Sequence, residues 1–176
     1  RQCTAMTTNN GYTGGLTNTY AYFAGYERNS SNQGFIRQLN VSDGTTNWAK
    51  WYNPGEYTVT TACFTDSSGN VYAGGYMVSS NYFIKLNSSG TLQWQKQFGS
   101  GQQFPKWGGV DSAGNVYVQH NSGTVSYLIK LNSSGVVQWQ RSITGSAGTS
   151  NSGTVVAVND SNIFVTFSAS DGTAVS

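Results

Sequence analysis

The sequence predicts an all-β protein built from a repeated unit, and three observations support this. The segment 66–72, Asp-Ser-Ser-Gly-Asn-Val-Tyr, returns at 111–117 with one substitution. The segment 84–90, Ile-Lys-Leu-Asn-Ser-Ser-Gly, returns unchanged at 129–135. Trp48, Trp94 and Trp139 recur at the same interval of about 45 residues. A period of about 40–50 residues filled with short strands is typical of a β-propeller, in which each repeat forms one four-stranded blade.

The second repeat defines the four strands of a blade. Residues at alternate positions share a character, as in Tyr82, Ile84 and Leu86, which is the period of two expected of a strand. Turn sequences rich in Asp, Asn, Ser and Gly separate the apolar segments. The predicted strands are Val59–Thr65, Asn70–Met77, Tyr82–Asn87 and Thr91–Phe98.

The other repeats are placed by comparison with the second. We expect blade 1 at about residues 1–52, blade 2 at 53–99, blade 3 at 100–145 and a partial blade 4 at 146–176. In blade 1 the innermost strand is predicted around Thr4–Thr8, followed by an insertion through Asn9-Asn10-Gly11 and Gly14-Gly15. Because propellers close with about four to eight blades, residues 1–176 are expected to be a propeller segment. It would be completed within a longer polypeptide or by partner chains.

The composition of the chain argues against some classes of binding partner. Charged residues make up 9% of the chain, against about 25% in ordinary globular domains, and aromatic residues make up 14%. The nine cations are scattered, so no basic patch for nucleic acid is predicted. No apolar run reaches the length of about 18 residues that a membrane span needs, so no membrane insertion is expected. Two cysteines, Cys3 and Cys63, are interpreted as small buried side chains that form at most one disulfide.

The repeated polar and aromatic residues have structural interpretations. Asp66, Asn70, Asp111 and Asn115 are expected to shape hairpin turns, where Asp accepts hydrogen bonds from backbone amides. They lack the acidic ligands and the bidentate Glu of a helix-flanked calcium loop, so no metal site is predicted. The three repeated tryptophans are expected to pack between neighbouring blades. Arg37 is aligned with Lys85 and Lys130, which would place three cations at the same level of successive blades.

No catalytic constellation is identified. His120 is the only histidine, and we interpret it as a surface-loop residue without a carboxylate or nucleophile partner. The carboxylates fall mostly in turns, and no nucleophile elbow, phosphate loop or dinucleotide motif is present. A protein that is not an enzyme and has no cofactor is therefore predicted.

At these repeats the sequence resembles a known class. The string Asp-Ser-Ser-Gly-Asn-Val-Tyr-Ala-Gly-Gly, followed by Ile-Lys-Leu-Asn-Ser-Ser-Gly-Thr-Leu-Gln-Trp-Gln, resembles the bacterial β-propeller repeat. Such repeats occur in secreted bacterial proteins and in virion structural proteins of tailed bacteriophages, marine cyanophages among them. The resemblance covers residues from about 20 to 164. Gly90–Trp94 and Gly135–Trp139 are also distantly similar to the repeats of quinoprotein dehydrogenases, but no acidic base, calcium site or adjacent cysteine pair is found here.

Three functional hypotheses follow. The first, which the phage resemblance implies, is a structural or adhesive component of a virion tail or capsid appendage. It would contact other subunits or a host-surface protein or glycan. The second is a secreted bacterial surface propeller that binds glycan or matrix, and the third is a quinoprotein-like dehydrogenase. Both of the first two place the protein in a virion or outside the cell. Their candidate binding residues are aromatic anchors in a polar surface, namely Tyr12, Tyr26, Tyr57, Tyr76 and Trp107.

Overall fold

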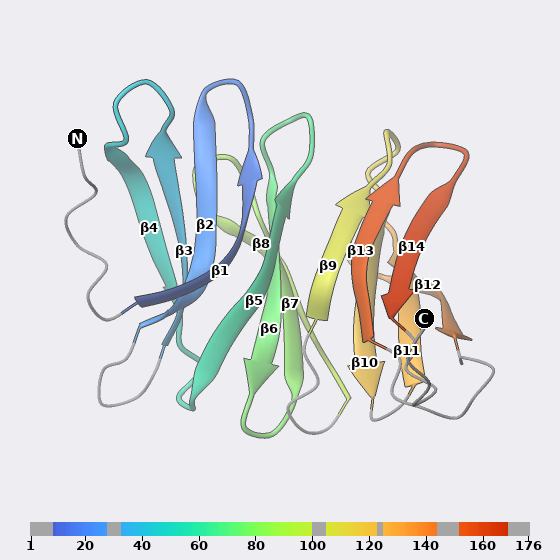
Figure 1. Cartoon of the computed structure of the whole chain (residues 1–176). Helices are drawn as coiled ribbons and strands as arrows, with labels where there is room; N and C mark the ends of the chain where they lie inside the picture. Colours follow the sequence, from blue (N-terminus) through green and yellow to red (C-terminus); the bar gives the residue numbers. More distant parts are fainter. Residues whose placement is uncertain (1–8, 28–32, 100–104, 123–124, 144–151, 169–176) are drawn as a thin grey trace, which may run out of the picture. The chain divides into compact units, whose positions relative to one another are not determined.

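The structure, a computed structural model, consists of antiparallel β-sheets (Figure 1). It describes residues 9–27, 33–99, 105–122, 125–143 and 152–168. The chain divides into two compact units, one ending at Gln102 and one beginning at Gln103. Each unit is described by itself. Among the described residues, none forms a helix that could cross a membrane.

The N-terminal unit contains two four-stranded sheets, each with its strands in sequence order. Sheet 1 consists of β1 (Asn9–Leu16), β2 (Tyr20–Glu27), β3 (Gln33–Asn40) and β4 (Thr46–Tyr52). Sheet 2 consists of β5 (Thr58–Thr65), β6 (Val71–Met77), β7 (Asn81–Leu86) and β8 (Leu92–Phe98).

The C-terminal unit repeats this order in one full sheet and one two-stranded sheet. Sheet 3 consists of β9 (Pro105–Val110), β10 (Val116–Ser122), β11 (Val125–Leu131) and β12 (Val137–Ile143). Sheet 4 consists of β13 (Ser152–Val158) and β14 (Ile163–Ser168). The prediction of an all-β protein made of antiparallel sheets is therefore confirmed.

The four strands predicted between residues 59 and 98 are confirmed to within one residue at each end. In the first repeat, the prediction of an insertion before Tyr20 was wrong. The strand that pairs with β2 is Asn9–Leu16, the segment expected to be an insertion, while Thr4–Thr8 lies outside the described residues. The glycines of this segment do not favour a strand by themselves, but its backbone pairs with β2 along its whole length.

Each sheet repeats the same irregularities of pairing. The first strand has one extra residue opposite the second strand, at Tyr12, Thr61, Lys106 and Thr154 in the four sheets. In sheets 1 to 3 the fourth strand has another extra residue directly before the repeated tryptophan, at Asn47, Gln93 and Gln138. Such bulges increase strand twist and fix the register. The repeat therefore determines the positions of the bulges, and with them the twist and register of each sheet, as well as the number of strands.

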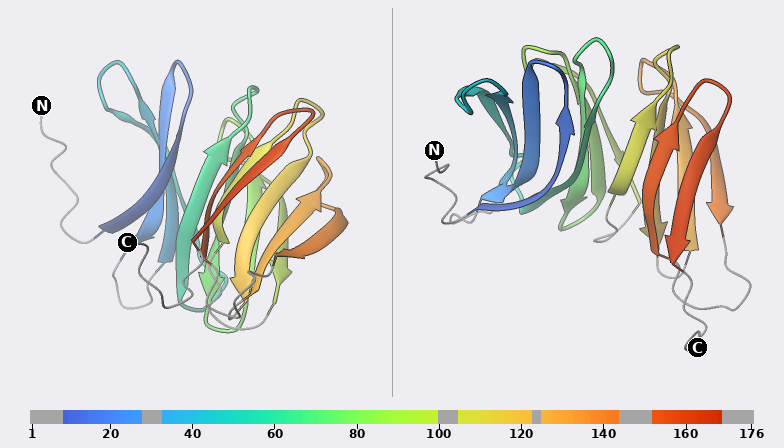
Figure 2. Two further views of the ribbon diagram at one scale, coloured as in Figure 1. Left: turned by 45° about the vertical axis from the view of Figure 1, so that its right-hand side comes forward. Right: turned by 45° about the horizontal axis from the view of Figure 1, so that its top comes forward.

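In the N-terminal unit, sheet 2 packs face to face on sheet 1, and β5 lies along β1, β2 and β3 (Figures 1 and 2). We call the face of sheet 1 that contains Tyr22, Ala24 and Ile36 its front face. Sheet 2 turns its opposite, or back, face toward it, and the two faces form one buried cluster. The back-face residues of that cluster are Cys63, Val71, Ala73, Met77, Tyr82, Ile84 and Leu86.

In the C-terminal unit, β13 packs on β9 and β10 in the same way. Tyr117 and Leu128 of sheet 3 form a cluster with Ile163 and Val165 of sheet 4. A Cβ atom at Gly109 would lie 2.7 Å from a methyl carbon of Val158, so the absence of a side chain there permits this approach. Both units therefore use one mode of stacking, back face on front face.

Candidate functional site

The carboxylate of Asp66 organises the first hairpin turn of sheet 2. Its oxygens accept hydrogen bonds from the backbone amides of Ser68 and Asn70, at 3.0 and 2.9 Å, and from the Asn70 side chain at 2.8 Å. The hydroxyl of Tyr72 donates a further bond to the same carboxylate at 3.1 Å. The pKa of the Tyr72 hydroxyl is raised, mainly by burial and to a lesser extent by the negative charge of Asp66. The hydroxyl therefore stays protonated and donates the hydrogen bond.

Asp111 rebuilds this arrangement in sheet 3. It accepts hydrogen bonds from the Asn115 backbone and side chain, both at 2.8 Å, and from the Tyr117 hydroxyl at 3.0 Å. Burial acts to raise the pKa of Asp111, but the bonds from Asn115 and Tyr117 and the charge of Lys130 outweigh it, so the pKa is lowered overall. Within the described ranges, no three His, Cys, Asp or Glu side chains form a group that could hold a metal ion.

The remaining carboxylates of the described segments are also engaged locally. Each accepts a hydrogen bond from a nearby turn or strand: Glu27 from Trp51, Asp43 from Thr45, Glu56 from Ser79 and Asp160 from Ser112. Asp171 lies outside the described residues. These acidic groups therefore link turns and strands of the protein to one another.

Each repeated tryptophan forms a cluster with the tyrosine of the second strand. The ring centroids are 6.2 Å apart for Trp48 and Tyr22, 6.3 Å for Trp94 and Tyr72, and 6.1 Å for Trp139 and Tyr117. Between the two strands, Lys85 and Lys130 place their ammonium groups 5.3 Å from the centroids of the Tyr72 and Tyr117 rings, respectively, in cation–π contacts.

The alignment of Arg37 with these lysines was wrong. Gln38 pairs with both Tyr22 and Trp48, as Lys85 pairs with Tyr72 and Trp94, so Gln38 is the structural equivalent. Gln38 donates a hydrogen bond to the Tyr22 hydroxyl at 2.8 Å in place of the cation–π contact. Arg37 lies on the opposite face of sheet 1 because neighbouring residues of a strand alternate in direction.

Trp48 also joins the two sheets of its unit. Its indole Nε1 donates a hydrogen bond to the backbone carbonyl of Ser88 in sheet 2 at 3.1 Å. A Cβ atom at Gly90 would lie 3.0 Å from the Trp48 ring, so the ring packs directly over that turn. At the other end of the contact, Tyr52 stacks on Tyr82 with centroids 4.3 Å apart.

Three of the predicted aromatic anchors, Tyr26, Tyr57 and Tyr76, lie together in the N-terminal unit. Tyr26 and Tyr76 lie in strands and are 6% and 9% exposed, in a cluster with Val59 and the partly buried Tyr57. They therefore do not fit the role of free anchors, because their rings stabilise the sheets instead. Tyr12 lies at the bulge of β1 and Trp107 lies in β9, and their side chains fall outside what the structure describes.

Two further expectations concern isolated reactive residues. His120 is not a surface-loop residue: it lies in β10, is 7% exposed and stacks on Tyr127 with centroids 5.1 Å apart. Cys63 lies in the core cluster of the N-terminal unit, where burial raises its pKa to about 12. Cys3 lies outside the described residues.

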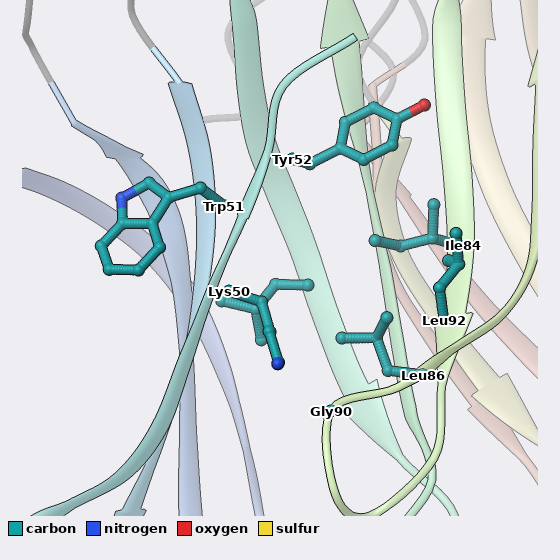
Figure 3. A pocket seen from close by; sticks show the side chains of 8 residues that line it. Lys50, Trp51, Tyr52, Ile84, Leu86, Gly90 and Leu92 are labelled. Atoms are coloured by element: carbon teal, nitrogen blue, oxygen red, sulfur yellow. The ribbon is translucent and has the colours of Figure 1, made fainter.

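The described cavity that could accept a ligand lies between sheets 1 and 2 and has a volume of about 150 Å³. Figure 3 shows the side chains of Lys50 and Tyr52 on the cavity side of β4, facing Leu86 and Leu92 of sheet 2, with Trp51 on the other side of the strand. It is lined by Ile36, Lys50, Trp51, Tyr52, Ile84, Leu86, Gly90 and Leu92.

The lining of this cavity is mainly apolar, with one cationic side chain and no carboxylate among the lining residues. A cavity of about this size with an apolar lining can hold a group as large as a benzene ring. Sequence reasoning missed it because its residues come from four strands. The only feature of the sequence that pointed to the cavity was the apolar residue Leu92, which directly follows a turn.

Comparison of the sequence with protein-family models and with curated proteins gives no match.

Proposed function

We propose that this chain is a segment of a β-propeller that serves as a non-catalytic structural module in a bacteriophage particle. The observation that carries the proposal is the reuse of one sheet design. Sheets 1 to 3 share the bulge before the repeated tryptophan and the tryptophan–tyrosine contact. Stacking of back face on front face in both units is the contact that successive propeller blades make.

The absence of catalysis in this proposal is supported by the state of the reactive side chains. The described carboxylates accept hydrogen bonds from other parts of the protein, within a turn, between strands of one sheet or between two turns, and His120 is stacked in a sheet. A general acid or base needs a geometry directed at a substrate, and these groups are directed at the protein itself. The phage assignment rests on the resemblance of the repeat to virion proteins.

The location is tested by quantitative mass spectrometry of a lysate fractionated into purified particles, cell envelopes and medium. Trypsin releases two diagnostic peptides, Leu86–Lys96 and Leu131–Arg141, whose sequences differ at positions that include Thr91/Val136 and Leu92/Val137. Both should be enriched in particles, at equal copy number and in a fixed ratio to the other virion proteins. Recovery of both only from envelopes or medium would refute the phage proposal and favour the secreted surface protein.

An adhesive role would use the cavity beside Lys50. A host molecule or neighbouring subunit could insert a small apolar group there, against Leu86 and Leu92. Particles that carry Leu92→Glu should then lose adsorption or incorporation of the module, while the matched variant Val78→Glu should not. Both residues are exposed, at 48% and 60%, but Val78 is not part of the cavity lining. Equal behaviour of the two variants would exclude the cavity as a contact.

A further inference from the structure

The cavity between sheets 1 and 2 has a buried apolar floor and an exposed margin. Ile36 and Leu86 belong to the floor and are 2% and 4% exposed. Trp51 is exposed too, but its indole lies on the other side of β4 (Figure 3). The remaining exposed residues of the lining are Lys50 and Leu92, on the facing strands β4 and β8. The cavity therefore opens to solvent between a cationic side chain and an apolar one.

The space on sheet 1 corresponds to a place that is filled on sheet 2. By register, Phe83 occupies in sheet 2 the place of Ile36 in sheet 1. Phe83 is completely buried, and its ring centroid lies 5.9 Å from those of Phe64 and Trp94. The smaller side chain of Ile36 leaves room at this position, so sheet 1 departs from the repeat where the cavity lies.

Lys50 gives the cavity a positive charge that no described residue neutralises. It makes neither an ion pair nor a hydrogen bond with any residue of the described ranges, and no carboxylate lines the cavity. A Cβ atom at Gly90 would lie 2.9 Å from Cε of Lys50, so the aliphatic stem packs over this turn. Arg141, at the matched place in sheet 3, instead lies over the Trp139 ring, 5.7 Å from its centroid. An ammonium group beside an apolar surface attracts an anion more strongly than it would in bulk water.

We propose that this cavity binds a free monocarboxylate with an apolar body of about six carbon atoms. The volume of about 150 Å³ and the apolar lining determine the size of the body, since such a cavity holds a group as large as benzene. The body would lie on Ile36, Ile84 and Leu86, and the carboxylate would accept a hydrogen bond from the Lys50 ammonium group.

This inference goes beyond the structural role in a particle, because the isolated chain would bind a free acid. It shares with the adhesive contact proposed above only the use of this cavity. A bound acid and an inserted apolar group of a host molecule would therefore compete for the same space.

The test is a titration of the isotope-labelled chain, followed by two-dimensional NMR. Heptanoate is the probe, and heptanamide is its neutral control of the same shape. Heptanoate should shift the amide signals of Lys50, Gly90 and Leu92, with a dissociation constant on the order of 1 mM or below, as expected for a ligand of so few atoms. It should bind about fivefold more tightly than heptanamide, because a partly exposed ion pair contributes about that much.

Two matched variants assign the preference to one side chain. Lys50→Gln removes the charge and should weaken heptanoate binding about fivefold while leaving heptanamide binding unchanged. Lys96→Gln is the control, because Lys96 has the same place in sheet 2 and does not line the cavity, so both affinities should stay as they are. Lys50→Arg keeps the charge and should keep the preference for heptanoate.

Three results would overturn the inference. They are the absence of these shifts up to about 10 mM heptanoate, equal affinities for heptanoate and heptanamide, and equal effects of Lys50→Gln and Lys96→Gln. None of them would bear on the virion location, which the peptide measurement tests separately. Loss of adsorption in Leu92→Glu particles without heptanoate binding would retain the cavity as a contact and reject only the carboxylate ligand.

Discussion

Replacing Gly75 with Ala should disrupt the pairing of β5 with β6. A Cβ atom at this position would lie 1.8 Å from the backbone oxygen of Val59 and 2.8 Å from Cα of Thr60. The oxygen is this close because Gly75 pairs with Thr60 directly beside the bulge at Thr61. A carbon and a carbonyl oxygen rarely approach closer than about 3.3 Å, so the strands would have to separate by roughly 1.5 Å.

The hydrogen bonds between β5 and β6 cannot persist at that separation. An N–H···O bond of ordinary length stretched by about 1.5 Å is no longer a hydrogen bond. The loss of local pairing, together with the overpacking itself, should lower the free energy of unfolding by at least about 3 kcal/mol. The measurement is urea unfolding followed by tryptophan fluorescence, with the two units expected to contribute separate transitions if they unfold independently.

Gly55→Ala is the matched control. Gly55 has a φ of 93°, and a Cβ atom there would meet nothing within 4 Å. Its substitution should cost only the backbone strain of a left-handed residue, about 1–2 kcal/mol. The steric argument is refuted if Gly75→Ala unfolds within about 0.5 kcal/mol of the unmodified chain, or if it is no more destabilising than the control.

Three other predictions concern buried or titrating side chains. Tyr82→Phe leaves the Thr60 hydroxyl without its bond of 2.6 Å in a buried site, so it should lower the free energy of unfolding by about 1–3 kcal/mol in the same urea assay. Because the folded-state pKa of Asp111 is lowered, its stabilisation is present above the unfolded pKa near 3.8 and is lost as the pH falls through the folded value. Asp111→Asn should therefore flatten the acid limb of the stability profile, and an unchanged limb would contradict this. Burial raises the pKa of Cys63 to about 12, against 9.0 for an ordinary thiol, so its contribution is complete below pH 9 and declines as the pH rises from there toward 12. Cys63→Ala should reduce the loss of stability in that window, and iodoacetamide should label Cys63 at neutral pH no faster than the chain opens.

The sequence was informative wherever local chemistry determines local structure. The turn at Asp66 was predictable because an Asp side chain can bond the amides that follow it, whatever the rest of the fold does. The strands of the second repeat were predictable because apolar alternation and turn residues agree along 40 residues or so of chain. The first repeat was not, because Asn9–Leu16 has no apolar alternation and forms a strand through its partner.

The register of β3 and the cavity between sheets 1 and 2 could not be predicted from the sequence, for a different reason. Matching Arg37 with Lys85 relied on their shared charge, but register is determined by the partner strand, and a slip of one residue reverses the face on which a side chain lies. The cavity depends on how two sheets diverge, with contacts at Trp48 and Tyr52 on either side of it. No spacing along the chain encodes that separation.

The residues that recur and those that break the repeat have different roles in this protein. The bulge of the first strand recurs in all four sheets, the tryptophan in sheets 1 to 3 and the turn carboxylate in sheets 2 and 3, and they shape the twist and turns of those sheets. Phe23 and Trp51 replace Ala73 and Gln97 at matched positions, and they are 37% and 48% exposed. A small residue such as Ala73 allows two sheets to approach, whereas a large ring at the matched position gives sheet 1 a differently shaped face. Function should therefore be sought where one repeat departs from the others, since the shared positions are already accounted for by the fold.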